Sequence, residues 1–279
     1  MRSKVVLRRL LRNKQARYGF IALILLVALA YAGPYFGAHD WTEKDFLAFL
    51  SPPDADHWWG TTSIGQDMYA ITLRGMQKSI IIGLLVALIS TGLAAVVGAF
   101  AGYFSGWADR LLMSGVDLLL VLPSFLMIAI ISPRLHGSSW LWFVALLAAF
   151  SWMITSRVVR SMTISLRERE YVQAAVYMGI PRWKIIFRHV VPNLSSLLII
   201  DATINVSGAI IGEAALSFFG FGIQPPDVSL GTLIAEGSRN ATGYPWLFAF
   251  PAGLLVALVL SVNLIGDGLR DALDPGSNS

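Results

Sequence analysis

Six long apolar runs limit what this sequence can fold into. Each run is about 20 residues long, which is the length that a helix needs to cross a lipid bilayer. The runs cover residues 18–36, 79–103, 112–132, 139–156, 194–218 and 245–266. Because every backbone N–H and C=O group in lipid has to be paired within the protein, single spans of this length are helices. We therefore expect an all-α integral membrane protein with six transmembrane helices.

The composition of the chain is that of a membrane protein. Hydrophobic residues make up 56% of the sequence and charged residues only 14%, and the mean hydropathy is +0.65. A soluble domain of this size does not carry so little charge. The chain has no cysteine, which excludes disulfides, thiolate metal sites and cysteine nucleophiles.

Lysine and arginine residues are divided unequally between the two sides of the membrane. With six spans, 16 of them fall on the side that holds both termini and 5 fall on the other side. Such an excess is typical of the cytoplasmic face. We therefore expect both termini and the polar segment 157–193 to be cytoplasmic. The isoelectric point near 9.5 then reflects topology, and we expect no nucleic-acid partner.

The segments between the spans differ in length and composition. The basic start of the chain and its first apolar run resemble a cleavable secretory signal. We expect the run to be retained, because it has span length and its removal would leave an odd number of helices. The transmembrane domain proper is expected to cover 79–270. The segments outside the spans are a cytoplasmic basic N-terminus (1–17), an extracytoplasmic segment (37–78), a cytoplasmic segment (157–193), an extracytoplasmic loop (219–244) and a cytoplasmic tail (267–279).

The end of the first extracytoplasmic segment has a weak amphipathic pattern. Met68, Ile71, Leu73 and Met76 alternate with polar and charged residues. This pattern suits a short helix that lies on the outer surface of the membrane. An ordinary loop agrees with the same residues equally well.

Several kinds of chemistry are missing from the sequence. No lysine follows a glycine, so there is no phosphate-binding loop and the chain does not hydrolyse ATP by that route. The sequence contains neither H-E-x-x-H nor G-x-S-x-G, and its four histidines lie far apart. We therefore expect no catalytic residue, no metal site and no cofactor on this chain. A transporter, a channel and a membrane scaffold remain as function classes.

Polar residues within the apolar runs are candidates for function, because charged groups in lipid are costly. Asp201, Asn205, Gly208 and Gly212 recur at helical spacing on one stripe of the fifth span. The stripe faces either a translocation pathway or a partner helix, and the residues leave both open. Two other acids have structural interpretations. We expect Asp117 to reach the interface or to pair with a base, and Glu213 to hold the following loop.

A second stripe lies on the second span. Thr91, Ala95, Gly98 and Gly102 have the same spacing and are all small. Helix packing is the favoured interpretation, because small residues let two backbones approach closely.

The cytoplasmic segment predicts a helical elbow. One helix is expected to run from 158 to 178, followed by Gly179 as a left-handed C-cap, and Pro181 is expected to open a second helix. Ala174 and Ala175 leave the bend with little bulk, and Arg182 adds positive charge beside it. Either another protein docks at this bend, or the segment is a linker that lies on lipid headgroups.

The elbow and three other stretches resemble a known family. Ala174-Ala175-x-x-x-Gly179, with Pro192 thirteen residues after the glycine, resembles the EAA loop of ABC-transporter permease subunits. HWWGTTSIGQDM (57–68), GEAALSFFGFGIQPPDVSLG (212–231) and NLIGDGLRDALDP (263–275) are similar to the C-type permease of oligopeptide and dipeptide importers. The resemblance implies the fold of a type I ABC importer permease with a cytoplasmic coupling elbow.

The resemblance also implies partners and residue roles. Two ATP-binding subunits or domains would carry ATP and Mg, a second, B-type permease would complete the pore, and an extracytoplasmic binding protein would deliver peptide. The location would be the bacterial plasma membrane. Related permeases serve nickel, haem or other small solutes, and a stand-alone ion-driven carrier is a further alternative. The residues implied in ATPase coupling are Gln173, Ala174, Ala175, Gly179, Pro181, Arg182 and Pro192.

Five positions depart from the pattern of that family. Thr62 stands where Asp is common, Gln66 where Arg is common, and Leu230 where Trp is common. In the elbow, Gln173 replaces an acid and His189 replaces an apolar residue. Substrate contacts and an ion pair of the elbow are therefore not carried over at these positions.

Overall fold

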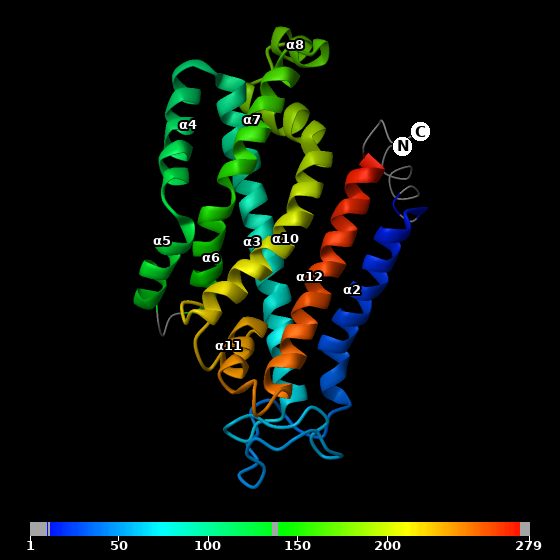
Figure 1. The fold of residues 1–279 in the computed structure, drawn as a ribbon. Coiled ribbons are helices and arrows are strands. Elements are labelled where there is room, and N and C mark those ends of the chain that lie inside the picture. The colour runs from blue at the N-terminus through cyan, green and yellow to red at the C-terminus, as the bar shows by residue number, and fades with distance from the viewer. Residues whose placement is uncertain (1–9, 11, 136–138, 274–279) are drawn as a thin grey trace.

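The computed structural model describes residue 10, residues 12–135 and residues 139–273. These residues form a bundle of helices, and within them the only β pairing is a single bridge between Thr61 and Asp67. Figure 1 shows long helices that run between two ends of the molecule. We call the end that carries helix α8 the elbow end and the opposite end, with α11 and residues 33–67, the loop end.

The helices fall into three groups by length. The long ones are α2 (Lys14–Ala32), α3 (Met68–Phe104), α10 (Ser195–Phe218) and α12 (Trp246–Leu273). Those of intermediate length are α4 (Gly106–Val121), α6 (Trp140–Ser151), α7 (Met153–Arg167) and α11 (Leu230–Asn240). The short ones are α5 (Ser124–Ile131), α8 (Glu170–Tyr177), α9 (Arg182–Ile185), a π turn (Ile186–Val190) and the 3₁₀ turns Gly33–Tyr35, Ser132–Leu135 and Val191–Leu194.

Four to six segments of the described chain are long and apolar enough to cross a membrane. Four are continuous: Lys14–Tyr35, Met68–Phe104, Arg182–Phe218 and Trp246–Leu273. Two more count if each of the bent pairs α4/α5 and α6/α7 is one span. The six apolar runs of the sequence correspond to these six segments, so the protein is a multi-pass membrane protein.

Two of the expected spans are broken. Helices α4 and α5 meet at an angle of 78°, and α6 and α7 meet at 47°. The first break falls at Leu122 and Pro123, where proline lacks a backbone N–H and cannot continue the helix. The second falls at Trp152. The sequence predicted one span each over 112–132 and 139–156 and no break within them, because hydropathy reports apolar length and not direction.

Helix α3 is the centre of the bundle. It packs against α7, α10 and α6, and more weakly against α2, α11 and α12. A Cβ atom added at Gly98 would lie 2.4 Å from the backbone oxygen of Ser156, and one at Gly102 would lie 2.6 Å from that of Arg160. The small stripe of the second span therefore lets α3 and α7 approach closely, as predicted for helix packing.

Helix α2 lies along α12. A Cβ atom at Gly19 would lie 2.8 Å from the backbone oxygen of Ser261, and one at Gly268 would lie 2.3 Å from the Cβ of Ala16. The start of α2 and the end of α12 lie at the elbow end (Figure 1). The two close contacts fix the first span on the outside of the bundle.

The amphipathic pattern that precedes the second span is part of α3. The helix begins at Met68, with the Asp67 side chain as its N-cap. Met68 and Ile71 pack with Leu233 and Leu247, in a cluster at the loop end. The prediction of a separate surface helix or loop was wrong, because these apolar residues face α11 and α12 instead of the membrane surface.

Candidate functional site

The segment that was predicted to be cytoplasmic, residues 157–193, forms an elbow that projects beyond the other helices (Figure 1). Its first part differs from the single helix expected over 158–178, since α7 ends at Arg167 and α8 begins at Glu170. Arg169 between them is extended. Gln173 stabilises this break, because its Nε2 donates a hydrogen bond to the carbonyl of Arg167 at 2.9 Å. An acidic side chain at position 173 has no N–H group when it is ionised, so it cannot donate this hydrogen bond.

The second part of the elbow bends and unwinds. Gly179 has a φ of +72°, which is the left-handed conformation predicted for it. Pro181 is the N-cap of α9, and the chain then passes through the π turn and a 3₁₀ turn before α10 begins. Pro192 lies in the 3₁₀ turn, where its missing N–H removes one α-helical hydrogen bond. The expected second helix is therefore irregular.

The inner face of the elbow is packed against the bundle. Val172 and Ala175 are fully buried, together with Ile185 and Ile186, against Tyr103 of α3. The sequence predicted that both alanines of the Ala174-Ala175 pair leave the bend open to a partner. Only Ala174 is exposed, since Ala175 belongs to this buried cluster.

The outer face of the elbow is apolar and exposed. Tyr177 is 87% exposed and Met178 is 70% exposed, and a Cβ atom at Gly179 would meet nothing within 4 Å. Pro181 and Arg182 are exposed as well. Large apolar side chains on a firmly packed base are typical of a protein-docking surface. We call Tyr177 and Met178 the elbow tip.

The base of the elbow is tied to the end of α3. The guanidinium of Arg167 donates to the backbone oxygen of Tyr103 at 3.2 Å and to the Oγ of Ser105 at 2.6 Å. The guanidinium of Arg182 lies 5.9 Å from the ring centre of Phe104. A displacement of the elbow therefore acts on α3 as well as on α7 and α10.

A polar centre joins α10 to two other helices. Asp201 accepts hydrogen bonds from the hydroxyl of Thr91 on α3 at 3.0 Å and from that of Thr155 on α7 at 2.7 Å. Asn205 donates its Nδ2 to Asp201 at 2.8 Å. The carboxylate is thus held by three neutral donors. Sequence analysis did not single out Thr155, because its link to Asp201 exists only in the folded chain.

The stripe on α10 divides into two parts. Asp201 and Asn205 are engaged with each other, whereas Cβ atoms at Gly208 and Gly212 would meet nothing within 4 Å. The two glycines therefore make no close helix contact within the described chain. Their role as pathway or as partner contact stays a prediction.

Glu213 holds the following loop from a fully buried position. Its carboxylate accepts hydrogen bonds from Ser217 and Ser229 at 2.6 Å each, and from Ser79 of α3 at 3.4 Å. Ser79 in turn accepts from the backbone N–H of Leu230 at 3.2 Å. Since Ser229 is the N-cap of α11, this network attaches α11 to α3 and α10.

Asp117 lies on α4 and forms an ion pair with Arg157 of α7. A second pair, between Asp109 and Arg160, joins the same two helices nearer the elbow end. Val116 is the one described residue of α4 that is buried. Ion pairs therefore contribute much of the contact between α4 and α7.

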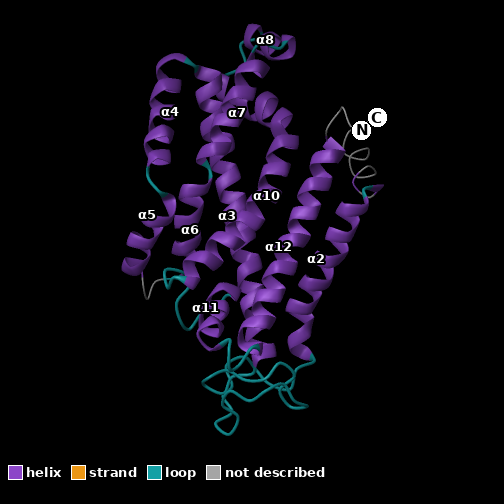
Figure 2. Ribbon diagram, viewed as in Figure 1, coloured by secondary structure: helices purple, strands orange, loops and turns teal. Residues whose placement is uncertain are grey.

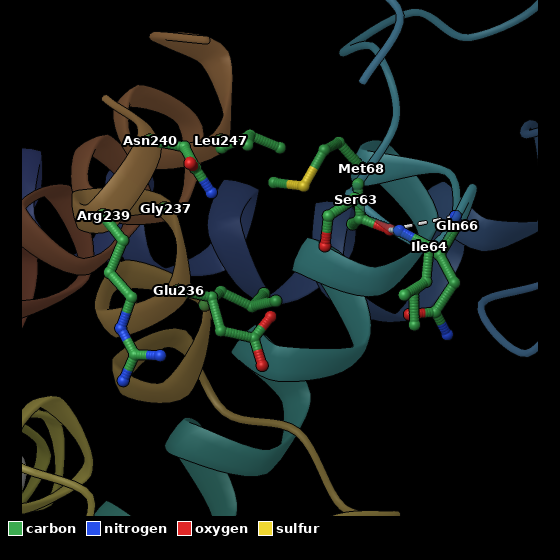
Figure 3. Close-up of a pocket in the computed structure, with 11 residues that line it drawn as sticks. Ser63, Ile64, Gln66, Met68, Glu236, Gly237, Arg239, Asn240 and Leu247 are labelled. Carbon is green, nitrogen blue, oxygen red and sulfur yellow. Dashed lines mark hydrogen bonds between the residues drawn. The ribbon is translucent and has the colours of Figure 1, made fainter. Parts of the chain in front are cut away.

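A pocket of about 220 Å³ lies at the loop end between the 62–68 turn, α11 and the start of α12. Figure 3 shows Glu236 projecting from α11 into the space beside α3. Two positions that depart from the family pattern, Thr62 and Gln66, line this pocket. Thr62 accepts from the backbone N–H of Gln66, and Gln66 donates to the backbone oxygen of Trp41. The third departure, Leu230, is fully buried.

Residues 33–67 are held in place partly by His57. Its Nδ1 lies 2.9 Å from Asp67 and its Nε2 lies 3.6 Å from Asp45. Burial lowers the pKa of His57, but the hydrogen bond and charge of Asp67, aided by Asp45 and Asp54, outweigh burial and raise the pKa above 6.5. The ring of His39 stacks on His57 at 4.4 Å.

Family models match two parts of the chain. Residues 94–278 match the model described as binding-protein-dependent transport system inner membrane component. Residues 2–53 match the model of the N-terminal transmembrane domain of oligopeptide transport permease C. The first match covers the end of α3 and the helices that follow it, and the second covers the first span.

Similar proteins align from end to end. The oligopeptide transport system permease protein OppC of Mycobacterium tuberculosis (strain H37Rv) is 58% identical over 279 residues, which are 100% of this chain and 96% of the relative. The protein of the same name in Mycobacterium bovis is equally similar. OppC of Bacillus subtilis (strain 168) is 34% identical over 263 residues, 94% of this chain and 86% of the relative. The chain therefore belongs to the family of inner-membrane components of binding-protein-dependent transport systems.

Proposed function

We propose that the chain is a permease subunit of an ATP-driven importer that carries oligopeptides across the bacterial plasma membrane. The observation that carries this proposal is the elbow, an exposed apolar tip on a buried base. The names of the relatives, oligopeptide transport permeases at 58% and 34% identity, support peptide as the substrate.

In this proposal the elbow couples the membrane helices to separate ATPase subunits on the cytoplasmic side. Residues 171–192 dock into a groove of the ATPase, and ATP binding moves the ATPase pair together. Val172 and Ala175 are packed against α3 and α7, and Arg167 is bonded to the end of α3. The movement therefore reaches the spans and shifts the population between outward-open and inward-open states.

The remaining partners follow from the two ends of the molecule. With the elbow inside, both termini are cytoplasmic and the loop end faces outward, where a binding protein delivers peptide. A second permease completes the pathway along surfaces that this chain leaves open, such as Gly212 of α10. ATP and Mg belong to the ATPase subunits, so this chain itself is not an enzyme in the proposal.

A copurification experiment tests the coupling role. Tyr177→Ala together with Met178→Ala removes the elbow tip but leaves the buried base, because both side chains project outward. We expect the double variant to lose its P-loop ATPase partners while still copurifying with the second permease. A matched double variant at the loop end, Phe46→Ala with Leu47→Ala, removes side chains that are also exposed. The ATPases should remain bound to that control, and their retention by the elbow variant would contradict the proposal.

A further inference from the structure

A hollow of about 350 Å³ lies where the two broken spans approach α10. It is bounded by residues on both sides of the α4/α5 break and of the α6/α7 break. Figure 1 shows the two breaks at a similar height in the bundle. The lining that matters here consists of Leu122, Ser124, Ser151, Met153, Asn205 and Gly208.

The break between α4 and α5 leaves backbone groups without helical partners. Leu122 and Pro123 are extended, and no described residue accepts a hydrogen bond from the backbone N–H of Ser124 or Phe125. Unpaired backbone at membrane depth occurs only where it is covered by protein or lines a water-filled cavity. In transporters, interrupted helices of this kind surround substrate sites.

Asn205 brings a fixed amide group to this hollow. Its Nδ2 is anchored to Asp201 at 2.8 Å, and Asp201 is held in turn by Thr91 and Thr155. No donor in the described part of the chain reaches the Oδ1 of Asn205. A primary amide has two N–H donors and a carbonyl acceptor, so one donor and the acceptor are free for a ligand. Gly208, close to Asn205 on α10, leaves space for the approach of another backbone.

The chemistry of the lining fits the main chain of a peptide better than any particular side chain. The polar side chains in the lining, Asn205, Ser124 and Ser151, are neutral, and the others are apolar or small. A substrate amide group pairs with the Asn205 amide in both directions, as donor and as acceptor. Apolar walls without charge accept many different side chains at modest cost.

We propose that this hollow holds the main chain of the translocating peptide, with the Asn205 amide hydrogen-bonded to a peptide group and Gly208 leaving room for it. The assignment rests on the proposed function and specifies its substrate site. Asp201 does not touch the peptide. It is a positioning residue, which fixes the Asn205 amide by way of α3 and α7.

Uptake by the complete transporter tests the site. The complex is reconstituted in proteoliposomes with its binding protein and given a mixed pool of peptides of equal length, read by mass spectrometry. Asn205→Leu should lower the uptake of every peptide about tenfold, whatever its side chains, because a desolvated peptide group loses its partner. The matched variant Thr203→Val removes a hydroxyl on α10 whose one hydrogen bond within the described residues goes to the backbone oxygen of Ile199. It should keep the uptake of the wild type.

Two results distinguish this site from the proposed function as a whole. If the wild-type complex takes up no peptide, the proposed function fails. If the wild type takes up peptides and Asn205→Leu equals it, or loses only peptides with certain side chains, the site assignment alone is overturned. The positioning role of Asp201 is tested by measuring KM for peptide uptake. Asp201→Asn alone should raise KM, but it should raise KM no further in a chain that already carries Asn205→Leu. Additive effects would contradict it.

Direct labelling covers the case in which Asn205→Leu does not assemble. The chain has no cysteine, so Gly208→Cys introduces its single thiol into the hollow. During turnover, a bromoacetyl peptide should label this thiol, and excess unmodified peptide should prevent the labelling. Gly253→Cys on α12 is the control, because it also points into open space but lies outside the hollow. Absent labelling at position 208, or equal labelling at both positions, overturns the proposal.

Discussion

Glu213 illustrates how one buried acid can join three elements. It is fully buried, and its partners are the hydroxyls of Ser79, Ser217 and Ser229. No ion pair to Glu213 exists among the described residues. A buried carboxyl group without hydrogen bonds is very costly, so the three serines are the condition for its presence. They belong to α3, to α10 and to the cap of α11.

Removing this acid should weaken the loop end. Glu213→Ala leaves the serine hydroxyls without their acceptor and opens a small cavity, so we expect the free energy of unfolding to fall by about 3 kcal/mol. Thermal unfolding of the detergent-solubilised complex measures the change. Glu236→Ala on the exposed face of α11 is the control, with an effect below about 0.5 kcal/mol. Equal stability of both variants would show that the serine network contributes nothing.

Because of His57, the local stability of residues 33–67 depends on pH. Because the pKa of His57 in the folded protein is raised above 6.5, protonation stabilises this segment. The stabilisation is complete below pH 6.5 and is lost as the pH rises through the folded pKa. Hydrogen exchange of residues 40–66 should therefore be slower at pH 6 than at pH 8, after correction for intrinsic rates. His57→Gln should abolish the difference, and its persistence in that variant would contradict the account.

Single residues were predictable where their role is local. Gly179 was recognised as a left-handed cap because a helix end needs that conformation. Asp201 and Asn205 were placed on one stripe by helical spacing. Their hydroxyl partners Thr91 and Thr155 belong to other helices, so only the packing of the bundle brings them together. For the same reason the sequence did not show that Ala175 faces inward.

Helices were predictable in position but not in direction. The apolar run 194–218 corresponds closely to α10 (Ser195–Phe218). The runs 112–132 and 139–156 each contain a bend, which a hydropathy pattern does not report. Pro123 was a visible signal for the first bend. At Trp152 no residue of comparable strength marks the second.

The contact between α3 and α7 gives a test of helix packing. Gly98→Ala places a Cβ atom 2.4 Å from the backbone oxygen of Ser156, so the helices have to move apart. We expect a loss of about 1–3 kcal/mol in the free energy of unfolding. Gly92→Ala on the same helix is the matched control, because its Cβ meets nothing within 4 Å. A thermal melt in which both variants equal the wild type would mean that this contact is not close in solution.

The whole molecule connects its two ends through α3 and α10. α3 is bonded to the elbow through Arg167 at one end and to α11 through Ser79 at the other. α10 begins directly after the elbow and carries both Asp201 and Glu213. Helix α4 is held to α7 by ion pairs, and α4 and α5 both lie beside the hollow. In the proposed importer, movement of the elbow can therefore open or close that hollow without unfolding the bundle.

ATP-dependent peptide uptake into proteoliposomes tests the central claim most directly. The comparison is between the complete complex, with second permease, ATPases and binding protein, and this chain reconstituted alone. We predict uptake of peptides from a mixed pool by the complete complex only in the presence of ATP, and no uptake by the chain alone. Peptide uptake by the lone chain, or uptake by the complex that does not depend on ATP, would contradict the account.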